Sequence, residues 1–193
     1  MSPHRQAEKP CPYCSGRHNR PCLLPAVSLA AVKHATSCAD PAVPSSCANG
    51  SVRRASRRLG QIYDEAFVTC GLKATQYSLL SQIARSGQPK MRDLAQALVM
   101  DLSALGHTLK PLVRDGLVEL QVDESDRRSR RVLLTEAGQQ KYQQARKISE
   151  RVSQVFDKTF GAQETLKLRQ ALDFIASEGF ARSLLEELKS SQS

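Results

Sequence analysis

Two adjoining stretches decide the fold of this chain: LAQALVMDLSALGHTLKPLVRDGLVELQV, residues 94 to 122, and DESDRRSRRVLLTEAG, residues 123 to 138. Apolar residues recur at three- and four-residue steps as far as Val113. This spacing predicts a short helix around Leu94 and a second helix that Asp101 caps and Gly116 ends. The period then changes to two over residues 117 to 122 and 130 to 134, which predicts a β-hairpin with a charged tip.

More helices flank this motif. Helical spacing begins at Val52 and again at Thr75, and after the hairpin we expect a long helix that Thr135 caps and Gly161 ends, then one last helix over 166 to 188. The expected fold is mainly α with a small β-hairpin wing: a winged helix-turn-helix at about 72–138 with dimerisation helices at about 51–68 and 136–190. These outer helices carry more apolar surface than a small winged domain can cover, so we expect a homodimer.

The stretch from residue 94 to 138 closely resembles the multiple antibiotic resistance regulator (MarR) family. The similarity includes Leu94-Ala95, Asp101 with Ser103, and the run from Asp126 to Thr135. ASRRLGQIYDEA, residues 55 to 66, and GLKATQYSLL, residues 71 to 80, extend it over 50 to about 190, so 51–193 is expected to form the family's domain. The resemblance implies a dimeric repressor that leaves a pseudopalindromic operator on binding a small aromatic effector or on cysteine oxidation. Since the sequence has no visible catalytic triad, phosphate loop or paired-carboxylate site, we expect neither an enzyme nor a cofactor.

One residue departs from the usual helix-turn-helix pattern. Val99 stands where such motifs usually carry glycine. Because a β-branched residue is strained at positive φ, either the turn avoids the left-handed conformation or Val99 is strained in it; we expect a slightly different turn.

The second helix of the motif is expected to enter the major groove of DNA. Its leucines at 102, 105, 109 and 112 are expected to face inward. Ser103 and Thr108 can hydrogen-bond bases or phosphates, Ala104 can contact a thymine methyl group, and Lys110 can contact phosphate. His107 either contacts a base or is an ordinary solvated residue.

The hairpin tip is the other expected DNA contact, through Arg127, Arg128, Arg130 and Arg131. A hairpin tip can place a guanidinium group in a narrow minor groove, and the resemblance assigns this role to Arg128, with the Asp126 carboxylate holding its side chain. Residues 90 to 135 carry eight Lys plus Arg against seven Asp plus Glu. Binding therefore relies on placed arginines, and the four arginines between 53 and 58 are expected to assist.

The first 50 residues differ in composition from the rest of the chain. They hold seven of the nine prolines and five of the six cysteines, with no sustained period, so 1–50 is expected to be a disordered Cys/Pro-rich tail. The longest apolar run, residues 22 to 32, is too short to span a membrane, and Pro25 interrupts it. The net charge of +9 favours a polyanionic partner. Charge alone does not distinguish nucleic acid from an anionic membrane surface, but the resemblance of the rest of the chain leads us to expect a cytoplasmic protein that binds DNA and not membranes.

Cysteine oxidation, if the chain uses it, is expected to act through Cys47. The resemblance to the redox-sensing members of the family places Asn49 at their cysteine, with Cys47 two residues before it and Tyr63 at one of the assisting tyrosines. Arg53 or Arg54 could stabilise the Cys47 thiolate. Cys70 is the weaker candidate, because a lone cysteine in a helix-helix turn is more often buried.

The tail also supports a different function. Cys11, Cys14, His18 and Cys22 are ligand types that suit tetrahedral zinc, although their spacing is unusual. Cys11 and Cys14 also form a Cys-Pro-Tyr-Cys pair, but no strand precedes it as a thiol-disulfide enzyme requires. A zinc-binding or redox protein is therefore the alternative function, and a shorter product that lacks the tail is a further alternative.

Overall fold

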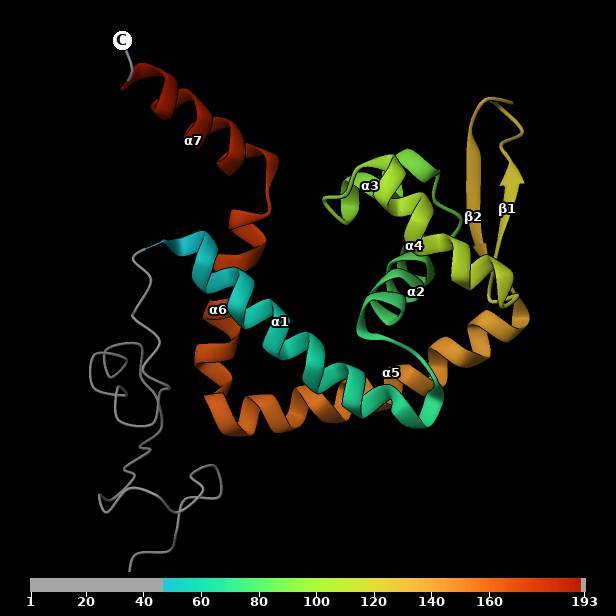
Figure 1. Ribbon diagram of the computed structural model, residues 1–193, viewed down its shortest axis with the longest axis horizontal. Coiled ribbons are helices and arrows are strands. Elements are labelled where there is room, and N and C mark those ends of the chain that lie inside the picture. Colours follow the sequence, from blue (N-terminus) through green and yellow to red (C-terminus); the bar gives the residue numbers. More distant parts are fainter. Residues whose placement is uncertain (1–46, 192–193) are drawn as a thin grey trace, which may run out of the picture. The chain divides into compact units, whose positions relative to one another are not determined.

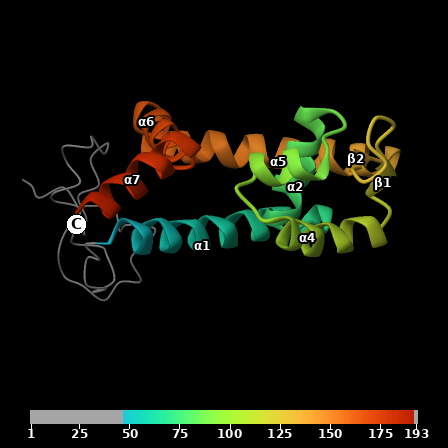
Figure 2. The ribbon, with the colours of Figure 1, turned by 90° about the horizontal axis from the view of Figure 1, so that it is seen from above.

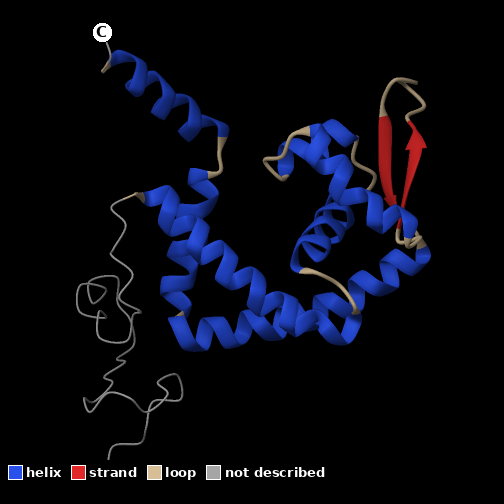
Figure 3. Ribbon diagram, viewed as in Figure 1, coloured by secondary structure: helices blue, strands red, loops and turns tan. Residues whose placement is uncertain are grey.

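The computed structural model describes residues 47–191 (Figure 1). The described residues fall into two compact units, Cys47–Val155 and the residues from Phe156 onward. They form seven α-helices, one 3-10 helix and one two-stranded antiparallel sheet, as Figure 3 shows. In chain order these are α1 (Ala48–Ala66), η2 (Phe67–Cys70), α2 (Ala74–Ser86), α3 (Met91–Ala97), α4 (Leu102–Arg114), β1 (Val118–Val122), β2 (Arg130–Leu134), α5 (Glu136–Phe160), α6 (Ala162–Ile175) and α7 (Glu178–Ser190).

The mainly helical fold with a hairpin wing is the one that the sequence predicts. The motif is α3, α4 and the β1–β2 hairpin, and α1, α2 and α5 to α7 flank it. The first helix begins at Ala48, four residues before the start expected from the apolar spacing. No helix in residues 47–191 is both long and apolar enough to cross a bilayer.

Side chains set the junction between α1 and α2. The backbone N–H of Ala74 donates to Asp64 Oδ1 at 2.7 Å, so a carboxylate of α1 satisfies an amide at the start of α2. Lys73 Nζ lies 3.7 Å from Asp64 Oδ2. The ring of Phe67, which is completely buried, packs between the rings of Tyr63 and Tyr77. The end of α1 is thereby attached to the winged part of the chain.

The core of the first unit lies among the helices of the motif and the hairpin. It consists of buried side chains: Phe67, Cys70, Leu72, Leu79, Leu80, Ile83, Leu94, Ala95, Leu105, Leu109, Leu112, Val118, Val132 and Ala145. Because α2, α3, α4, β2 and α5 all contribute, the orientation of α4 depends on packing from several elements.

The junction of the hairpin and α5 depends on Thr135 and Gly138. Thr135 Oγ1 accepts from the Gly138 N–H at 3.0 Å and donates to the Gly116 carbonyl at 2.6 Å, which confirms Thr135 as the helix cap. A Cβ on Gly138 would collide with the Leu117 carbonyl. Glycine is therefore required for α5 to approach the segment that follows α4 this closely.

The second unit corrects one prediction from the sequence. The single helix expected over 166 to 188 is two helices, because the chain breaks after Ile175 and Ser177 caps α7 by accepting from the Phe180 N–H at 3.2 Å. Gly161 follows α5, as expected, and its carbonyl accepts from the buried hydroxyl of Thr165 at 2.8 Å. The apolar spacing continues across the break, so it does not reveal the cap.

Candidate DNA-binding site

The turn between α3 and α4 has left-handed backbone geometry at Val99. Its N–H donates to the Gln96 carbonyl at 3.0 Å, and the Met100 N–H donates to the Ala95 carbonyl at 2.9 Å. This pair of hydrogen bonds is a Schellman helix end, which requires positive φ at the residue after the helix cap. Val99 has φ 52°. Of the two alternatives, the strained Val99 is the one observed, because the helix end imposes the left-handed conformation; the expectation of a different turn is wrong.

Helix α4 begins at a side-chain cap and is oriented by its leucines. Asp101 Oδ1 accepts from the Ala104 N–H at 2.7 Å, which confirms the predicted cap. Leu105, Leu109 and Leu112 are almost wholly buried. Leu102, also expected to face inward, is 51% exposed, because it precedes the first turn that packs on the core.

The opposite face of α4 is open to solvent. Ser103, His107 and Lys110 are exposed and follow one another at steps of four and three residues, so they line one side of the helix. Ala104 and Thr108 are half-buried at its flank. The Thr108 hydroxyl donates to the Ala104 carbonyl at 2.9 Å, which leaves its oxygen lone pairs free to accept. All five side chains that the sequence selected therefore lie on or beside the exposed face.

The hairpin is anchored to the segment that precedes α3. Strand β1 pairs with β2 from Val118 opposite Leu134 to Val122 opposite Arg130. An isolated bridge joins Lys90 to Arg131, so the short stretch before α3 extends the sheet. Because Arg131 is one residue from the tip end of β2, this bridge holds the distal part of the hairpin against that segment.

Asp123 organises the loop at the hairpin tip. Its carboxylate is completely buried, and Oδ1 accepts from the Ser125 hydroxyl at 2.5 Å, the Ser125 N–H at 3.0 Å and the Asp126 N–H at 2.9 Å. Oδ2 forms an ion pair with Arg131 Nε, and Lys90 Nζ lies 3.5 Å from Oδ1. The Ser125 hydroxyl, then the backbone amides and the Arg131 charge, hold the pKa of Asp123 well below its usual range despite its burial.

These contacts change the roles that the sequence suggested for two charged residues. Asp126 Oδ1 accepts from the Arg128 backbone N–H at 3.0 Å, so it fixes the Arg128 main chain and not the side chain. Arg131 is bound to Asp123 and donates to the Gln88 carbonyl at 2.9 Å, so it is a structural residue of the wing. Arg127, Arg128 and Arg130 are exposed and form no ion pair with another described residue. Three of the four tip arginines are thus available to a polyanion.

The arginines of α1 lie elsewhere. Arg54, Arg57 and Arg58 line a shallow hollow with Ala55 and Gln61 on the exposed face of that helix. Figures 1 and 2 both place the N-terminal half of α1 apart from α4 and the hairpin. The structure therefore does not place these arginines beside α4 and the hairpin, and their expected assistance gains no support from this arrangement.

The cysteines occupy different environments. Cys47 is exposed and precedes the first turn of α1. Cys70 is buried, and its thiol donates to the Phe67 carbonyl at 3.2 Å. The candidate zinc ligands Cys11, Cys14, His18 and Cys22 lie outside the described residues, as does the rest of the tail.

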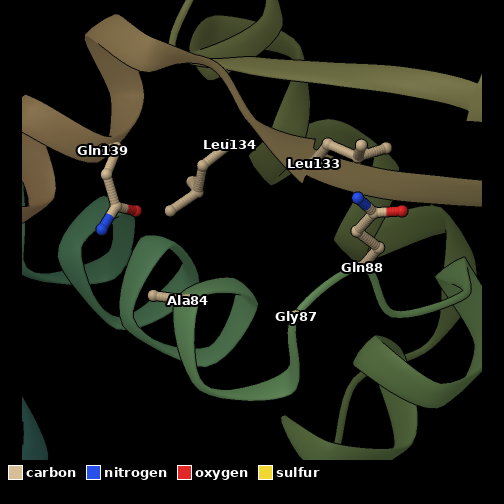
Figure 4. A pocket seen from close by; sticks show the side chains of 6 residues that line it. All are labelled: Ala84, Gly87, Gln88, Leu133, Leu134 and Gln139. Atoms are coloured by element: carbon tan, nitrogen blue, oxygen red, sulfur yellow. The ribbon is translucent and has the colours of Figure 1, made fainter.

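A shallow hollow of about 270 Å³ lies between α2, the end of β2 and the start of α5 (Figure 4). Two leucines and two glutamine side chains contribute to its lining, and no charged side chain does: it is formed by Ala84, Gly87, Gln88, Leu133, Leu134 and Gln139. Sequence spacing did not identify it, because its lining comes from three separate elements.

A helix with an exposed polar face, a helix-turn-helix turn before it and a hairpin with free arginines after it define a winged helix-turn-helix DNA-binding protein. The comparisons agree with this class. A model described as the MarR family matches residues 71–129. The crystal structure of the transcriptional regulator MosR of M. tuberculosis in complex with DNA is 30% identical, covers 70% of this chain and 97% of its own, and superposes with a TM-score of 0.63. The chain belongs to the MarR family and is a DNA-binding transcriptional regulator, not an enzyme.

More distant structures share the fold. A cysteine-to-serine variant of E. coli MarR complexed with operator DNA is 23% identical, with a TM-score of 0.60 and coverage of 66% of this chain and 91% of that one. Bordetella bronchiseptica BpsR, whose DNA binding 6-hydroxynicotinic acid regulates, is 21% identical, with a TM-score of 0.62 and coverage of 72% and 99%. No curated protein sequence matches the chain significantly.

Proposed function

We propose that the chain is a repressor that binds a pseudopalindromic operator as a homodimer, with α4 in the major groove and the hairpin tip in the minor groove. The observation that carries this proposal is that one arginine at the hairpin tip has a structural role while the other three are exposed. Arg131 is bound to the buried Asp123, whereas Arg127, Arg128 and Arg130 remain exposed on the loop that this carboxylate holds. A loop fixed in this way can present a guanidinium group to DNA without first being ordered.

The residues of α4 have distinct proposed roles. His107, in the middle of the exposed face, is the proposed base-reading residue, and Ser103 and Thr108 hydrogen-bond bases or phosphates. Ala104 contacts a thymine methyl group, and Lys110, further along the helix, binds phosphate. The buried leucines on the opposite side of α4 fix its rotation about its own axis, so these residues stay on the solvent-exposed face.

The salt dependence of binding tests the role of Arg128. Arg128→Ala should weaken binding to the DNA upstream of the chain's own gene and reduce the slope of log affinity against log salt by about one unit. Arg57→Ala, in the exposed basic face of α1, is the matched control and should leave the slope unchanged. An unchanged slope in Arg128→Ala would remove the minor-groove role.

The proposal of a dimer rests on the exposed apolar side chains of the second unit, which begins at Phe156. Its two helices expose apolar side chains that a monomer would leave in water: Leu166, Leu172, Phe174, Ile175, Leu184, Leu185 and Leu188. A two-fold dimer covers the same surface on both copies and places two recognition helices one DNA turn, roughly 34 Å, apart. Sedimentation equilibrium should give twice the mass of 21.3 kDa, and a monomer at micromolar concentration would contradict this.

Release from DNA is proposed to follow binding of a small aromatic molecule. The regulation of BpsR by 6-hydroxynicotinic acid supports this class of effector. The hollow at Leu133 and Gln139 offers apolar contact and amide hydrogen bonds beside the base of the hairpin, without a charged side chain in its lining. The apolar side chains can contact the ring of such a molecule, and the glutamine amides can hydrogen-bond its polar groups. Leu133→Trp should fill the hollow, and it should abolish release by such compounds while DNA binding persists.

Oxidation of Cys47 is the second proposed route to release. Its support is the exposed thiol immediately before the first turn of α1. Footprints of wild type and Cys47→Ser, each repeated with a hydroperoxide and with aromatic compounds, separate the two routes. Loss of protection by hydroperoxide in the wild type alone supports Cys47, and protection that ignores the oxidant in both proteins removes it.

A further inference from the structure

Gly106 lies in the middle of α4, where glycine destabilises a helix relative to alanine. The fold of the described residues does not require it there. Gly106 is not among the glycines with positive φ, and a Cβ at this position would meet no atom within 4 Å. Gly138, by contrast, is required by its contact with the Leu117 carbonyl. No contact among the described residues therefore accounts for glycine at this position.

The position of Gly106 suggests a reason for glycine there. It follows Leu102 and precedes Lys110 by one helical turn each, and it is adjacent to His107. Leu102 is 51% exposed although it is apolar. Leu102 and the bare backbone at Gly106 thus form an apolar strip beside the polar row of Ser103, His107 and Lys110.

We propose that this strip receives the methyl group of a thymine, with Gly106 as the point where α4 comes closest to DNA. In the major groove the methyl group of thymine is the apolar feature of the base edges, and apolar side chains contact it. A side chain at 106 would hold the helix away from the base, whereas glycine lets it approach. Gly106 is thus a positioning residue, and Leu102 contacts the methyl group. The inference rests on the proposed insertion of α4 into the major groove.

The first test is Gly106→Ala, measured for thermal unfolding and for binding to the site that wild type protects upstream of its own gene. The variant should unfold about 2–4 °C higher, because alanine favours the helix. Its affinity for the site should nevertheless fall about tenfold, the loss of one good base contact. If Gly106 had only a structural role, its replacement would not raise the unfolding temperature and weaken DNA binding at the same time.

Gly60→Ala is the matched control, since Gly60 also lies inside a helix and an added Cβ there would likewise meet no atom within 4 Å. It should raise the unfolding temperature similarly, keep the wild-type mass in sedimentation, and bind the site as wild type does. Gly106→Ala that binds like wild type, or that unfolds at a lower temperature, overturns the inference.

The second test replaces each thymine of the site by deoxyuridine, which lacks the methyl group. At the thymine that Leu102 contacts in each half-site, the wild type should lose about fourfold in affinity, the factor expected for one methyl group. Leu102→Ala should bind the natural duplex and the duplex substituted at that thymine equally, while it keeps any loss at the thymine assigned to Ala104. Wild type that binds all substituted duplexes equally contradicts the proposed contact. Wild type that does not distinguish the site from unrelated DNA contradicts the proposed function itself.

Discussion

Replacing Val99 by glycine should stabilise the protein. Val99 ends α3 in a Schellman motif at φ 52°, a conformation that a β-branched side chain disfavours. The other end of the recognition helix provides a reference. There the Gly116 N–H donates to the Val113 carbonyl and the Leu117 N–H to the Leu112 carbonyl, which is the same motif with glycine at φ 68°. The chain thus carries one strained and one relaxed example of a single turn.

The expected gain follows from three contributions. Relief of the left-handed conformation adds about 2 kcal/mol to the free energy of unfolding, within the usual range for a strained backbone residue. The Val99 side chain is 71% exposed, so its removal sacrifices only about 0.6 kcal/mol of burial. The greater freedom of glycine in the unfolded chain costs about 0.5 kcal/mol. The net gain is about 1 kcal/mol, a rise of about 2–4 °C in the midpoint of thermal unfolding.

Urea and thermal unfolding of the full chain, followed by circular dichroism, provide the measurement. Val99→Gly should raise the urea midpoint without changing the slope, and Gly116→Val should lower it by a similar amount. A Val99→Gly variant that is less stable than wild type would refute the reasoning. It would mean that the side chain contributes packing that its exposure does not reveal.

Three further predictions concern the supports of the site. The pKa of Asp123 is lower in the folded state than in the unfolded chain, so its carboxylate stabilises the fold above about pH 4, and this contribution is lost as the pH falls through the folded pKa. The difference in free energy of unfolding between wild type and Asp123→Asn should therefore shrink in acid. A difference that stays constant with pH would contradict this. Asp101→Ala should lower the free energy of unfolding by about 1 kcal/mol through loss of the α4 cap, and no loss in urea titration would show that the cap is redundant. Gly138→Ala should cost about 1–3 kcal/mol, because its methyl group collides with the Leu117 carbonyl; wild-type stability would mean that α5 moves freely.

Much of the site could be predicted from sequence because local signals agreed there. The leucine spacing of α4, its Asp101 cap, its Gly116 end and the change of period at the hairpin all indicate the same elements, and the structure contains them. The exposed residues of α4 followed from this spacing, since burial of Leu105 and Leu109 leaves Ser103 and His107 on the other side.

The errors arose where a contact distant in sequence or a backbone requirement decides the outcome. Arg131 looked like the other tip arginines, and its separate role depends on the buried carboxylate of Asp123 across the hairpin. The Asp-x-Ser-Asp order of residues 123 to 126 could have suggested a side chain that folds back on its own loop. Val99 was misjudged because the helix end imposes a left-handed residue whatever its identity.

Two carboxylates of the wing have separate structural roles. Asp123 forms an ion pair with Arg131 of β2, and Asp126 fixes the Arg128 main chain. Loss of Asp123 should therefore reduce DNA affinity even though it removes a negative charge. A simple electrostatic account would give the opposite sign, since removing an acid strengthens attraction to phosphate.

The most direct test of the central claim is a hydroxyl-radical footprint of the wild-type chain on the DNA upstream of its own gene, with Arg128→Ala in parallel. Two protected half-sites about one helical turn apart, related as a pseudopalindrome, are expected. In Arg128→Ala the minor-groove protection next to each half-site should disappear, while the central protection persists at higher protein concentration. Uniform protection without half-sites, or a pattern that Arg128→Ala does not change, would contradict the proposal that α4 and the wing read DNA together.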